Sequence, residues 1–372
     1  MQKVKVLHVV SSLKTGGVEK LLYDLYEHID RNEIEFSFIT HNDPGIIEEY
    51  LIKKNVKVFH LINRRKHPVL SAIQFYKFLL RNHFDIIHFH GNFEIVLEFI
   101  AAKFAKEENL IVHSHNYKKK LPIILKIINH IAQKLFVLYA KMCIGCSKAA
   151  GYYGFGNIKK LDNYVTLYNS IEIDKYKYNE NTRSIVRKQL NIQTNEFVIG
   201  TIGRLTKQKN QIFLLNVIEK LRSYNQFIKV LIIGEGEDGN LLKKFVVKNK
   251  LNDIVIFLGV RKDIPDLLNS MDLFILTSKY EGLPIVGVEA QASGLPCLFS
   301  EEITQEIKIF DKVLFLSVND IEIWVKTIKK VIKESSSDNR NRLFDSRICK
   351  YNIQDMAIQL VKIYHSILLK VK

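Results

Sequence analysis

The chain has 372 residues, of which 47% are hydrophobic, and this is enough for two domains that each bury a core. Its formal net charge is +16, but the basic excess is spread over both halves and accompanies no zinc-finger spacing, basic zipper or aromatic RNA-binding signature, so we expect no nucleic-acid partner. Four cysteines are too few for a disulfide framework, and Cys143 and Cys146, despite their C-x-x-C spacing, lack a second pair with metal-ligand spacing.

The opening sequence MQKVKVLHVV does not predict a signal peptide. Its apolar run is too short, and no small-residue cleavage site follows it. No apolar stretch reaches the roughly 18 residues that span a bilayer. We therefore expect a cytoplasmic protein that is soluble or bound peripherally to the inner face of the cytoplasmic membrane.

Strand and helix patterns alternate along the whole chain. Apolar residues recur with helical spacing in segments such as Val18–Ile29 and Gln211–Arg222. This alternation is typical of βαβ units and parallel sheets, and there are enough units for two sheets. The predicted strands are Val4–Val10, Glu35–Thr40, Val56–Leu61, Asp85–His90, Leu110–Ser114, Met142–Ser147, Phe197–Ile202, Lys229–Ile233, Ile254–Leu258, Leu273–Thr277 and Pro296–Phe299.

Polar stretches divide the chain. We place a linker near residues 168–184, between an amino-terminal domain over 1–168 and a carboxyl-terminal domain over 185–345. A second polar stretch precedes an amphipathic segment, Met356–Leu369, within the remaining residues 346–372.

Glycine-rich turns follow several predicted strands. Gly16 and Gly17 lie between the first strand and the first helix, where backbone N–H groups can bind phosphate, although an ordinary tight turn has the same sequence. GEGEDG at 234–239 matches the dinucleotide-binding pattern. However, its acidic residues would repel a pyrophosphate, and the pattern belongs at the first βα turn of its domain. We therefore interpret it as a tight strand exit.

Two histidine pairs, His88 with His90 and His113 with His115, end consecutive predicted strands. Ligands of an open parallel sheet bind beyond such ends, where a histidine can donate to a substrate or take part in acid–base chemistry. Two H-x-H pairs could also indicate a metal, but no carboxylate completes a ligand set. We expect no metal, and one packed histidine in each pair.

The loop GRLTKQKN at 203–210 follows the first strand of the second domain. Arg204 offers a planar fork and Lys209 a point charge, a combination that suits a diphosphate. The alternative is a solvated surface loop.

The segment KYEGLPIVGVEAQASGLP holds two carboxylates eight residues apart. If Pro284 opens a helix, Glu281 lies in the preceding loop and Glu289 inside the apolar helix. A buried carboxylate needs a partner, and the vicinal hydroxyls of a ribose can provide one. Glu281 can contact a sugar, and the backbone N–H groups of Gly282 and Leu283 can bind phosphate at the helix start.

Four segments, in chain order, resemble the motifs of retaining glycosyltransferases of family four, which have the GT-B fold. They are TGGVEK, the histidine region ending in HSHN, GRLTKQKN and EGLPIVGVEAQASGLP, and they span residues 15–296. The nearest sub-group is that of bacterial enzymes of capsular and exopolysaccharide assembly. The resemblance implies an α/β fold with two Rossmann-like parallel-sheet domains facing across a cleft. The first domain would bind the acceptor and the second the nucleotide sugar, and the last helix would return to the first.

The resemblance also implies the reaction. A sugar passes from a nucleoside diphosphate sugar, UDP-linked by family habit, to a glycan or polyprenyl-linked acceptor, without a cofactor or metal. Arg204 and Lys209 would neutralise the donor diphosphate, and Gly16 and Gly17 would approach it from the other domain. Glu289 would hold the ribose.

Further roles concern the reacting sugar and the base. Glu281 would contact the transferred sugar near the anomeric centre, and His115 would bond the sugar or assist at the reacting centre, with His113 as the alternative. Val260 and Arg261 would lie against the nucleotide base.

Some features bear on this resemblance. Asn169-Ser170 stands where the family has Asn-Gly, so the turn there can differ, because serine lacks the conformational freedom of glycine. No D-x-D pair is present, which agrees with the metal-independent habit of the fold. A sugar-nucleotide epimerase of similar build and a non-catalytic sugar-nucleotide-binding subunit remain alternatives.

Residues 118–141 hold six lysines and no acidic residue among many aliphatic ones. A basic amphipathic helix of this kind can lie on anionic lipid. We expect Lys118, Lys119 and Lys120 to contact the membrane surface on the acceptor side. The alternative is a sheet-covering helix with one buried face and solvated lysines.

Overall fold

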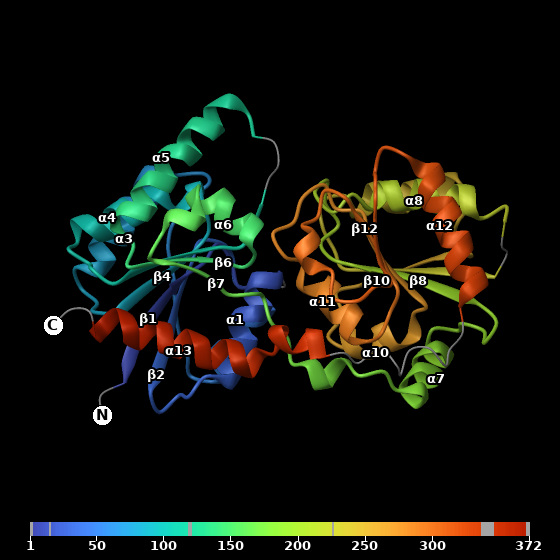
Figure 1. Cartoon of the computed structure of the whole chain (residues 1–372), viewed down its shortest axis with the longest axis horizontal. Helices are drawn as coiled ribbons and strands as arrows, with labels where there is room; N and C mark the ends of the chain where they lie inside the picture. The colour runs from blue at the N-terminus through green and yellow to red at the C-terminus, as the bar shows by residue number, and fades with distance from the viewer. Residues whose placement is uncertain (1–2, 15, 118–120, 225–226, 336–345, 370–372) are drawn as a thin grey trace. The chain divides into compact units, whose positions relative to one another are not determined.

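The computed structural model describes residues 3–14, 16–117, 121–224, 227–335 and 346–369, and the chain divides into two compact units. The first unit consists of Met1–Ser170 and Tyr351–Lys372, and the second of Ile171–Lys350. Each unit is built on one parallel sheet with helices packed against it (Figure 1). Among the described residues, no helix is both long and apolar enough to cross a membrane.

The sheet of the first unit has the strand order β3-β2-β1-β4-β5-β6-β7, and all of its pairings are parallel. The chain order reverses between β1 and β4, which is where ligands of open parallel sheets bind. The strands are β1 (Val4–Val9), β2 (Ile34–Thr40), β3 (Lys57–His60), β4 (Ile86–His90), β5 (Leu110–Ser114), β6 (Met142–Gly145) and β7 (Tyr164–Thr166). The helices are α1 (Gly17–His28), α2 (Ile46–Lys53), α3 (Pro68–Leu79), α4 (Val96–Phe104), α5 (Ile123–Tyr139), α6 (Lys148–Phe155) and α13 (Ile353–Leu369).

The two faces of this sheet differ in chemistry. Successive side chains of a strand point to opposite faces, so Leu7 and Phe89 enter an apolar core together with Phe136 of α5. On the other face His88 lies against α13, with its Nδ1 atom 2.9 Å from the hydroxyl of Tyr364. Helix α13 also packs against α1, so the end of the chain covers the sheet formed at its beginning.

The sheet of the second unit has the order β10-β9-β8-β11-β12-β13, and its pairings are also parallel. Its strands are β8 (Phe197–Ile202), β9 (Ile228–Ile233), β10 (Val255–Gly259), β11 (Leu273–Leu276), β12 (Cys297–Ser300) and β13 (Val313–Leu316). Its helices are α7 (Glu180–Gln189), α8 (Gln211–Leu221), α9 (Gly239–Lys248), α10 (Ile264–Ser270), α11 (Ile285–Ala292) and α12 (Ile321–Glu334). The core under α8 and α12 contains Trp324, the only tryptophan of the chain.

Every predicted strand is found within two residues of its expected ends, because buried parallel strands are continuous apolar runs. Two strands were missed, β7 and β13, and both lie at an edge of their sheet. The linker prediction over 168–184 was partly wrong, since α7 begins inside it. Asn179 caps α7 by accepting a hydrogen bond from the Thr182 backbone N–H at 2.9 Å. The polar composition concealed only the start of this helix, because its buried residues, Val186 and Arg187, lie in its second half.

Candidate functional site

The loop 203–210 is fixed on the carboxyl edge of the second sheet. Its Leu205 backbone N–H donates to the carbonyl of Glu235, at the exit of β9, over 3.0 Å. The exit must pass very close to the loop: a Cβ on Gly236 would lie 2.3 Å from the Leu205 carbonyl oxygen, and Gly234 has a φ of +125°. The interpretation of GEGEDG as a tight strand exit is confirmed.

Lys209 and Glu281 form an ion pair on this edge. The Lys209 Nζ atom lies 2.5 Å from Glu281 Oε1, and the hydroxyl of Ser278 donates to the same oxygen over 2.8 Å. The two charged side chains are 16% and 9% exposed. Thr277, directly after β11, donates to the carbonyl of Asn210 over 2.9 Å and so ties the loop to the next strand. A cation and a carboxylate from segments far apart in the sequence thus lie in contact at the carboxyl edge of the second sheet.

Glu289 lies inside α11 and is 2% exposed. Its Oε1 atom accepts a hydrogen bond from the hydroxyl of Tyr176 over 2.6 Å. Tyr176 ends a short 3-10 turn at Ile173–Tyr176, in the stretch that the sequence indicated as linker. A partner for this carboxylate is expected from its burial, but Tyr176 is not predictable as that partner, because nothing in a polar segment indicates where its tyrosines pack.

Arg204 is anchored through its backbone. Its carbonyl accepts a hydrogen bond from the Gln211 side chain over 3.0 Å, and its own side chain is exposed at the sheet edge. Gly282 and Leu283 are buried in the loop that leads into α11. These residues and the ion pair therefore belong to loops at the same carboxyl edge, after β8 and β11.

Val260 and Arg261 follow β10. Val260 is 40% exposed. Arg261 is exposed, and its guanidinium donates to the Asp263 carboxylate over 2.8 Å and 2.5 Å.

Gly16 and Gly17 start α1 of the first unit, with Gly16 at the N-cap. Thr15 lies outside the described residues. The carboxylate of Glu19 lies over this turn: it accepts a hydrogen bond from the Ser12 hydroxyl over 2.6 Å, and a Cβ on Gly16 would lie 2.1 Å from one of its oxygens. The helix start is therefore already approached by an acidic group of its own first turn.

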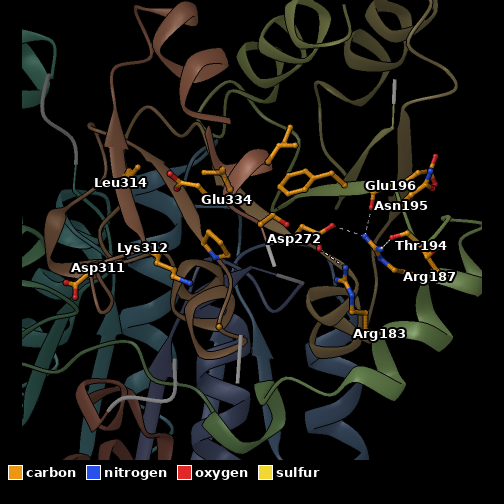
Figure 2. A pocket seen from close by; sticks show the side chains of 16 residues that line it. Arg183, Arg187, Thr194, Asn195, Glu196, Asp272, Asp311, Lys312, Leu314 and Glu334 are labelled. Atoms are coloured by element: carbon orange, nitrogen blue, oxygen red, sulfur yellow. Dashed lines mark hydrogen bonds and ion pairs between the residues drawn. The ribbon is translucent and has the colours of Figure 1, made fainter. Parts of the chain in front are cut away.

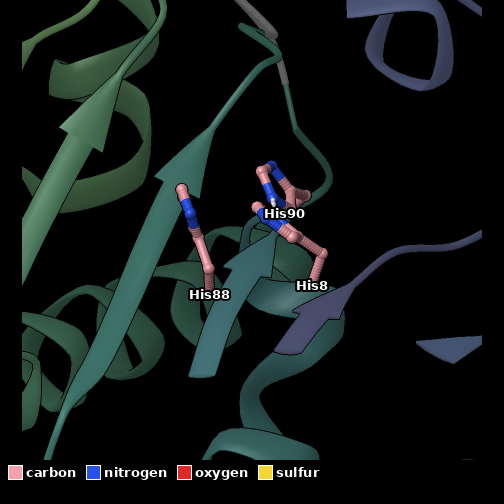
Figure 3. Close-up of side chains that lie close together, drawn as sticks. All are labelled: His8, His88 and His90. Atoms are coloured by element: carbon pink, nitrogen blue, oxygen red, sulfur yellow. Dashed lines mark hydrogen bonds between the residues drawn. The ribbon is translucent and has the colours of Figure 1, made fainter. Parts of the chain in front are cut away.

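The histidine pairs meet on one face of the first sheet. The parallel register sets His8 beside His88 and His90 beside His113. His8 Nδ1 lies 2.9 Å from His90 Nε2, and His90 Nδ1 lies 2.9 Å from His115 Nε2. Figure 3 shows three of these rings, from β1 and β4, converging at the strand ends. His8 was not among the predicted histidines, because its place in the cluster depends on β1 lying next to β4.

Burial controls the charge of this cluster. Burial lowers the pKa of His8 to about 3 and that of His115 to about 4, and a hydrogen bond that the His115 ring shares with the Asn169 side chain raises the pKa of His115 only partly against this effect. Burial also lowers the pKa values of His88, His90 and His113 well below the ordinary range. All five rings are therefore neutral at pH 7. Because both members of each pair are buried, burial does not separate a functional histidine from a packed one.

Lys118, Lys119 and Lys120 lie outside the described residues. The helix that follows them, α5, has an exposed apolar face that includes Ile123 and Ile124, which are 78% and 72% exposed. Its described lysines, Lys126 and Lys134, are also exposed.

A pocket of about 520 Å³ in the second unit lies elsewhere (Figure 2). Its lining includes Phe197 and Pro296, which stand at the amino ends of β8 and β12, the edge opposite to that of the loops described above. Its arginines are already paired, since Arg183 and Arg187 contact Asp272 over 2.6 Å and 2.7 Å. We interpret this pocket as part of the anchorage of α7.

Two parallel α/β sheets in two units, with charged loops at a carboxyl edge, define the GT-B class of glycosyltransferase folds. HepE of Anabaena, crystallised with UDP, matches with a TM-score of 0.78 at 21% identity, covering 98% of this chain and 100% of its own. Sucrose-phosphate synthase of Thermosynechococcus elongatus matches with a TM-score of 0.78 at 14% identity, covering 99% and 100%. The predicted fold class is confirmed.

Family models match both units: "Glycosyltransferase Family 4" over residues 15–173 and "Glycosyl transferases group 1" over 182–344. The chain belongs to this family of glycosyltransferases. The UDP-Gal:alpha-D-GlcNAc-diphosphoundecaprenol alpha-1,3-galactosyltransferase of Escherichia coli is 26% identical over 96% of this chain and 98% of its own length. The capsular polysaccharide biosynthesis glycosyltransferase CapH of Staphylococcus aureus is 25% identical over 95% and 98%.

Proposed function

We propose that the chain is a retaining hexosyltransferase that moves a sugar from a UDP-sugar to a glycan or polyprenyl-linked acceptor in bacterial surface polysaccharide assembly. The observation that carries this proposal is the Lys209–Glu281 pair at the carboxyl edge of the second sheet. The names of the relatives support it: one acts with UDP-Gal on a diphosphoundecaprenol-linked acceptor, and HepE was crystallised with UDP-glucose.

The donor side follows from charge. A departing nucleoside diphosphate must be stabilised, and preorganised cations do this at little reorganisation cost. We assign this task to Arg204 and Lys209, with the backbone of Gly282 and Leu283 at the start of α11 and with Gly16 and Gly17 of the first unit. Because Glu281 fixes Lys209 before any ligand arrives, the cation is already in place.

We assign the two carboxylates, Glu281 and Glu289, to the uncharged sugar and ribose parts of the nucleotide sugar. We assign the ribose hydroxyls to Glu289, whose one oxygen is held by Tyr176, and the transferred sugar to Glu281. His115 is assigned to the sugar or the reacting centre, and the base to Val260 and Arg261. On this view residues 185–345 bind the nucleotide sugar and residues 1–168 bind the acceptor.

Nucleotide release tests the reaction. The chain is mixed with UDP-, GDP- or ADP-sugars, with and without a polyprenyl diphosphate-linked sugar. We expect UDP release that depends on the acceptor. Turnover of the donor without acceptor would indicate an epimerase, and binding without release a non-catalytic subunit. Glu289→Ala should weaken UDP-sugar binding, while Glu237→Ala, an exposed acid near the same edge, should not.

We further propose that α5 docks on anionic lipid. A helix that only covers a sheet has no need of exposed isoleucines, yet Ile123, Ile124 and Ile127 are more than half exposed beside exposed lysines and no acidic residue. Apolar side chains with interleaved cations fit a negatively charged membrane surface. Lys118, Lys119 and Lys120 would add to the charge.

Vesicle sedimentation tests the docking. The chain should bind phosphatidylglycerol–phosphatidylcholine vesicles more strongly than phosphatidylcholine alone. Ile123→Asn with Ile127→Asn should reduce binding to both vesicles, and replacing Lys118–Lys120 with serine should remove the preference for anionic lipid. Val247→Asn, at a residue 63% exposed on α9, is the control. Unchanged binding in the α5 variants would refute this role.

A further inference from the structure

The histidine cluster has more ring nitrogens than its hydrogen bonds use. His113 is 1% exposed, and neither of its ring nitrogens has a hydrogen-bond partner among the described residues. A buried polar atom without a partner costs about 1–3 kcal/mol. A ring with two such atoms, packed 3.9 Å from the ring of His115 between centroids, therefore points to a missing ligand.

His90, His113 and His115 each offer one nitrogen, and the three nitrogens lie within 4.8 Å of one another. We propose that these three histidines bind one divalent transition-metal ion, such as Zn²⁺ or Co²⁺, at the carboxyl edge of the first sheet. In a tetrahedral site with Zn–N distances of about 2.0–2.1 Å the nitrogens stand roughly 3.3 Å apart. The 2.9 Å contact between His90 and His115 has to open by only a few tenths of an ångström.

A second trio, His8, His88 and His90, also has its nitrogens within 4.8 Å. Access and hydrogen bonding favour the first trio. His90 and His115 are each 6% exposed at the strand ends, whereas His8 and His88 are 0% and 1% exposed. His88 is also bonded to Tyr364. The metal site is therefore placed at the outer end of the cluster.

The chemistry of the three ligand atoms determines which metal ion fits the site. Three imidazoles and no carboxylate suit Zn²⁺, Co²⁺, Ni²⁺ or Cu²⁺ and not Mg²⁺ or Ca²⁺, which prefer oxygen. Imidazole binds a metal ion in its neutral form. Three neutral ligands leave the ion with its full charge and one open position, which a water or an anion takes.

The site would differ in task from the loops that we assign to the donor diphosphate, which use cations of the chain. A metal bound here would also fix the position of His115, which we assign to the sugar or the reacting centre. This effect on the reaction rests on the proposed function, whereas metal binding itself does not.

Cobalt titration tests the site. The chain, without a histidine tag and freed of metal by a chelator, is titrated with Co²⁺ and followed by visible d–d absorption. We expect one tetrahedral Co²⁺ per chain, displaced by Zn²⁺. His113→Asn and His90→Gln should each weaken binding at least about tenfold. His88→Gln, on the inner side of the cluster, and His130→Gln, exposed on α5, should leave it unchanged.

The outcomes separate the possibilities. Loss of binding in His88→Gln would place the ion in the inner trio and overturn the assignment, and loss in His130→Gln would indicate an adventitious surface ion. Absence of a tetrahedral spectrum in the wild type would overturn the proposal as a whole. X-ray absorption on Zn²⁺-loaded wild type needs no variant to fold: three imidazole ligands support the site, and fewer than three refute it.

Discussion

Removing Lys209 should destabilise the second unit more than removing its partner. Lys209→Met leaves the Glu281 carboxylate, 9% exposed, with the Ser278 hydroxyl but without its cation. Breaking a buried pair costs about 3–5 kcal/mol when the remaining charge is trapped, and we expect about 2–4 kcal/mol here because Ser278 remains. Glu281→Gln should cost only about 1–2 kcal/mol, because the flexible stem of Lys209 can carry its ammonium to water.

Trp324 allows this difference to be measured in one unit. It is the only tryptophan, it is fully buried in the second unit, and its fluorescence therefore reports urea unfolding there. The midpoints of Lys209→Met, Glu281→Gln and the double variant are compared at equal m values. Lys207→Met, in the same loop but exposed, is the control. If Glu281→Gln lowers the midpoint more than Lys209→Met, or if Lys209→Met matches Lys207→Met, the argument from trapped charge is refuted.

Three further variants or treatments test other parts of the structure. Gly236→Ala should destabilise by about 1–3 kcal/mol, because its methyl group meets the Leu205 carbonyl, whereas Gly239→Ala, whose Cβ would lie 3.6 Å from the nearest atom, should be neutral by thermal shift. Burial alone would raise the pKa of Glu98, but the His41 hydrogen bond, the charge of Arg64 and the Ser71 hydroxyl lower it below 4.5, so the folded chain binds fewer protons than the unfolded one. The stabilisation that comes from the ionised Glu98 carboxylate is present above pH 4.5 and is lost as pH falls through the folded pKa. Glu98→Gln should lower the free energy of unfolding by about 3–5 kcal/mol. The melting temperature of this variant, measured by circular dichroism, should fall less steeply at acidic pH than that of the wild type. Burial raises the pKa of Cys143 to about 12 and also that of Cys297, while Cys349 is exposed, so a thiol reagent should label one cysteine in the native chain and four in denaturant.

Most of the fold is readable in the sequence because parallel strands buried on both faces are continuous apolar runs. The failures have a common cause. Strand β7 is short and half-buried at a sheet edge, and the first turns of α7 are polar and are anchored by the ion pair of Arg183 with Asp272. Apolar periodicity predicts which side chains are buried as hydrocarbon. It therefore does not predict an element that is held by ion pairs or that lies half-buried at the edge of a sheet.

The positions of the candidate residues at the ends of strands were predictable, but their pairings were not. Lys209 and Glu281 were each expected at the carboxyl edge, yet they are 72 residues apart and meet only because β8 and β11 are neighbours in the sheet. The same applies to the histidines. His8 interrupts an apolar strand and gives no local signal, and it joins the others only because β1 lies next to β4. Pairings across strands need the strand order, which local patterns do not contain.

The glycines of GEGEDG show what a short motif does report. In a dinucleotide loop such glycines let a phosphate approach the backbone. Here Gly236 admits the Leu205 carbonyl, and the Glu235 carbonyl accepts the Leu205 N–H. The glycine pattern therefore indicates that some group approaches the backbone closely, but it does not indicate whether that group is a phosphate or another part of the chain. The charges nearby bear on that question: the acidic residues of 234–239 would repel a phosphate, and the neighbouring loop with Arg204 and Lys209 is the one that we propose to bind it.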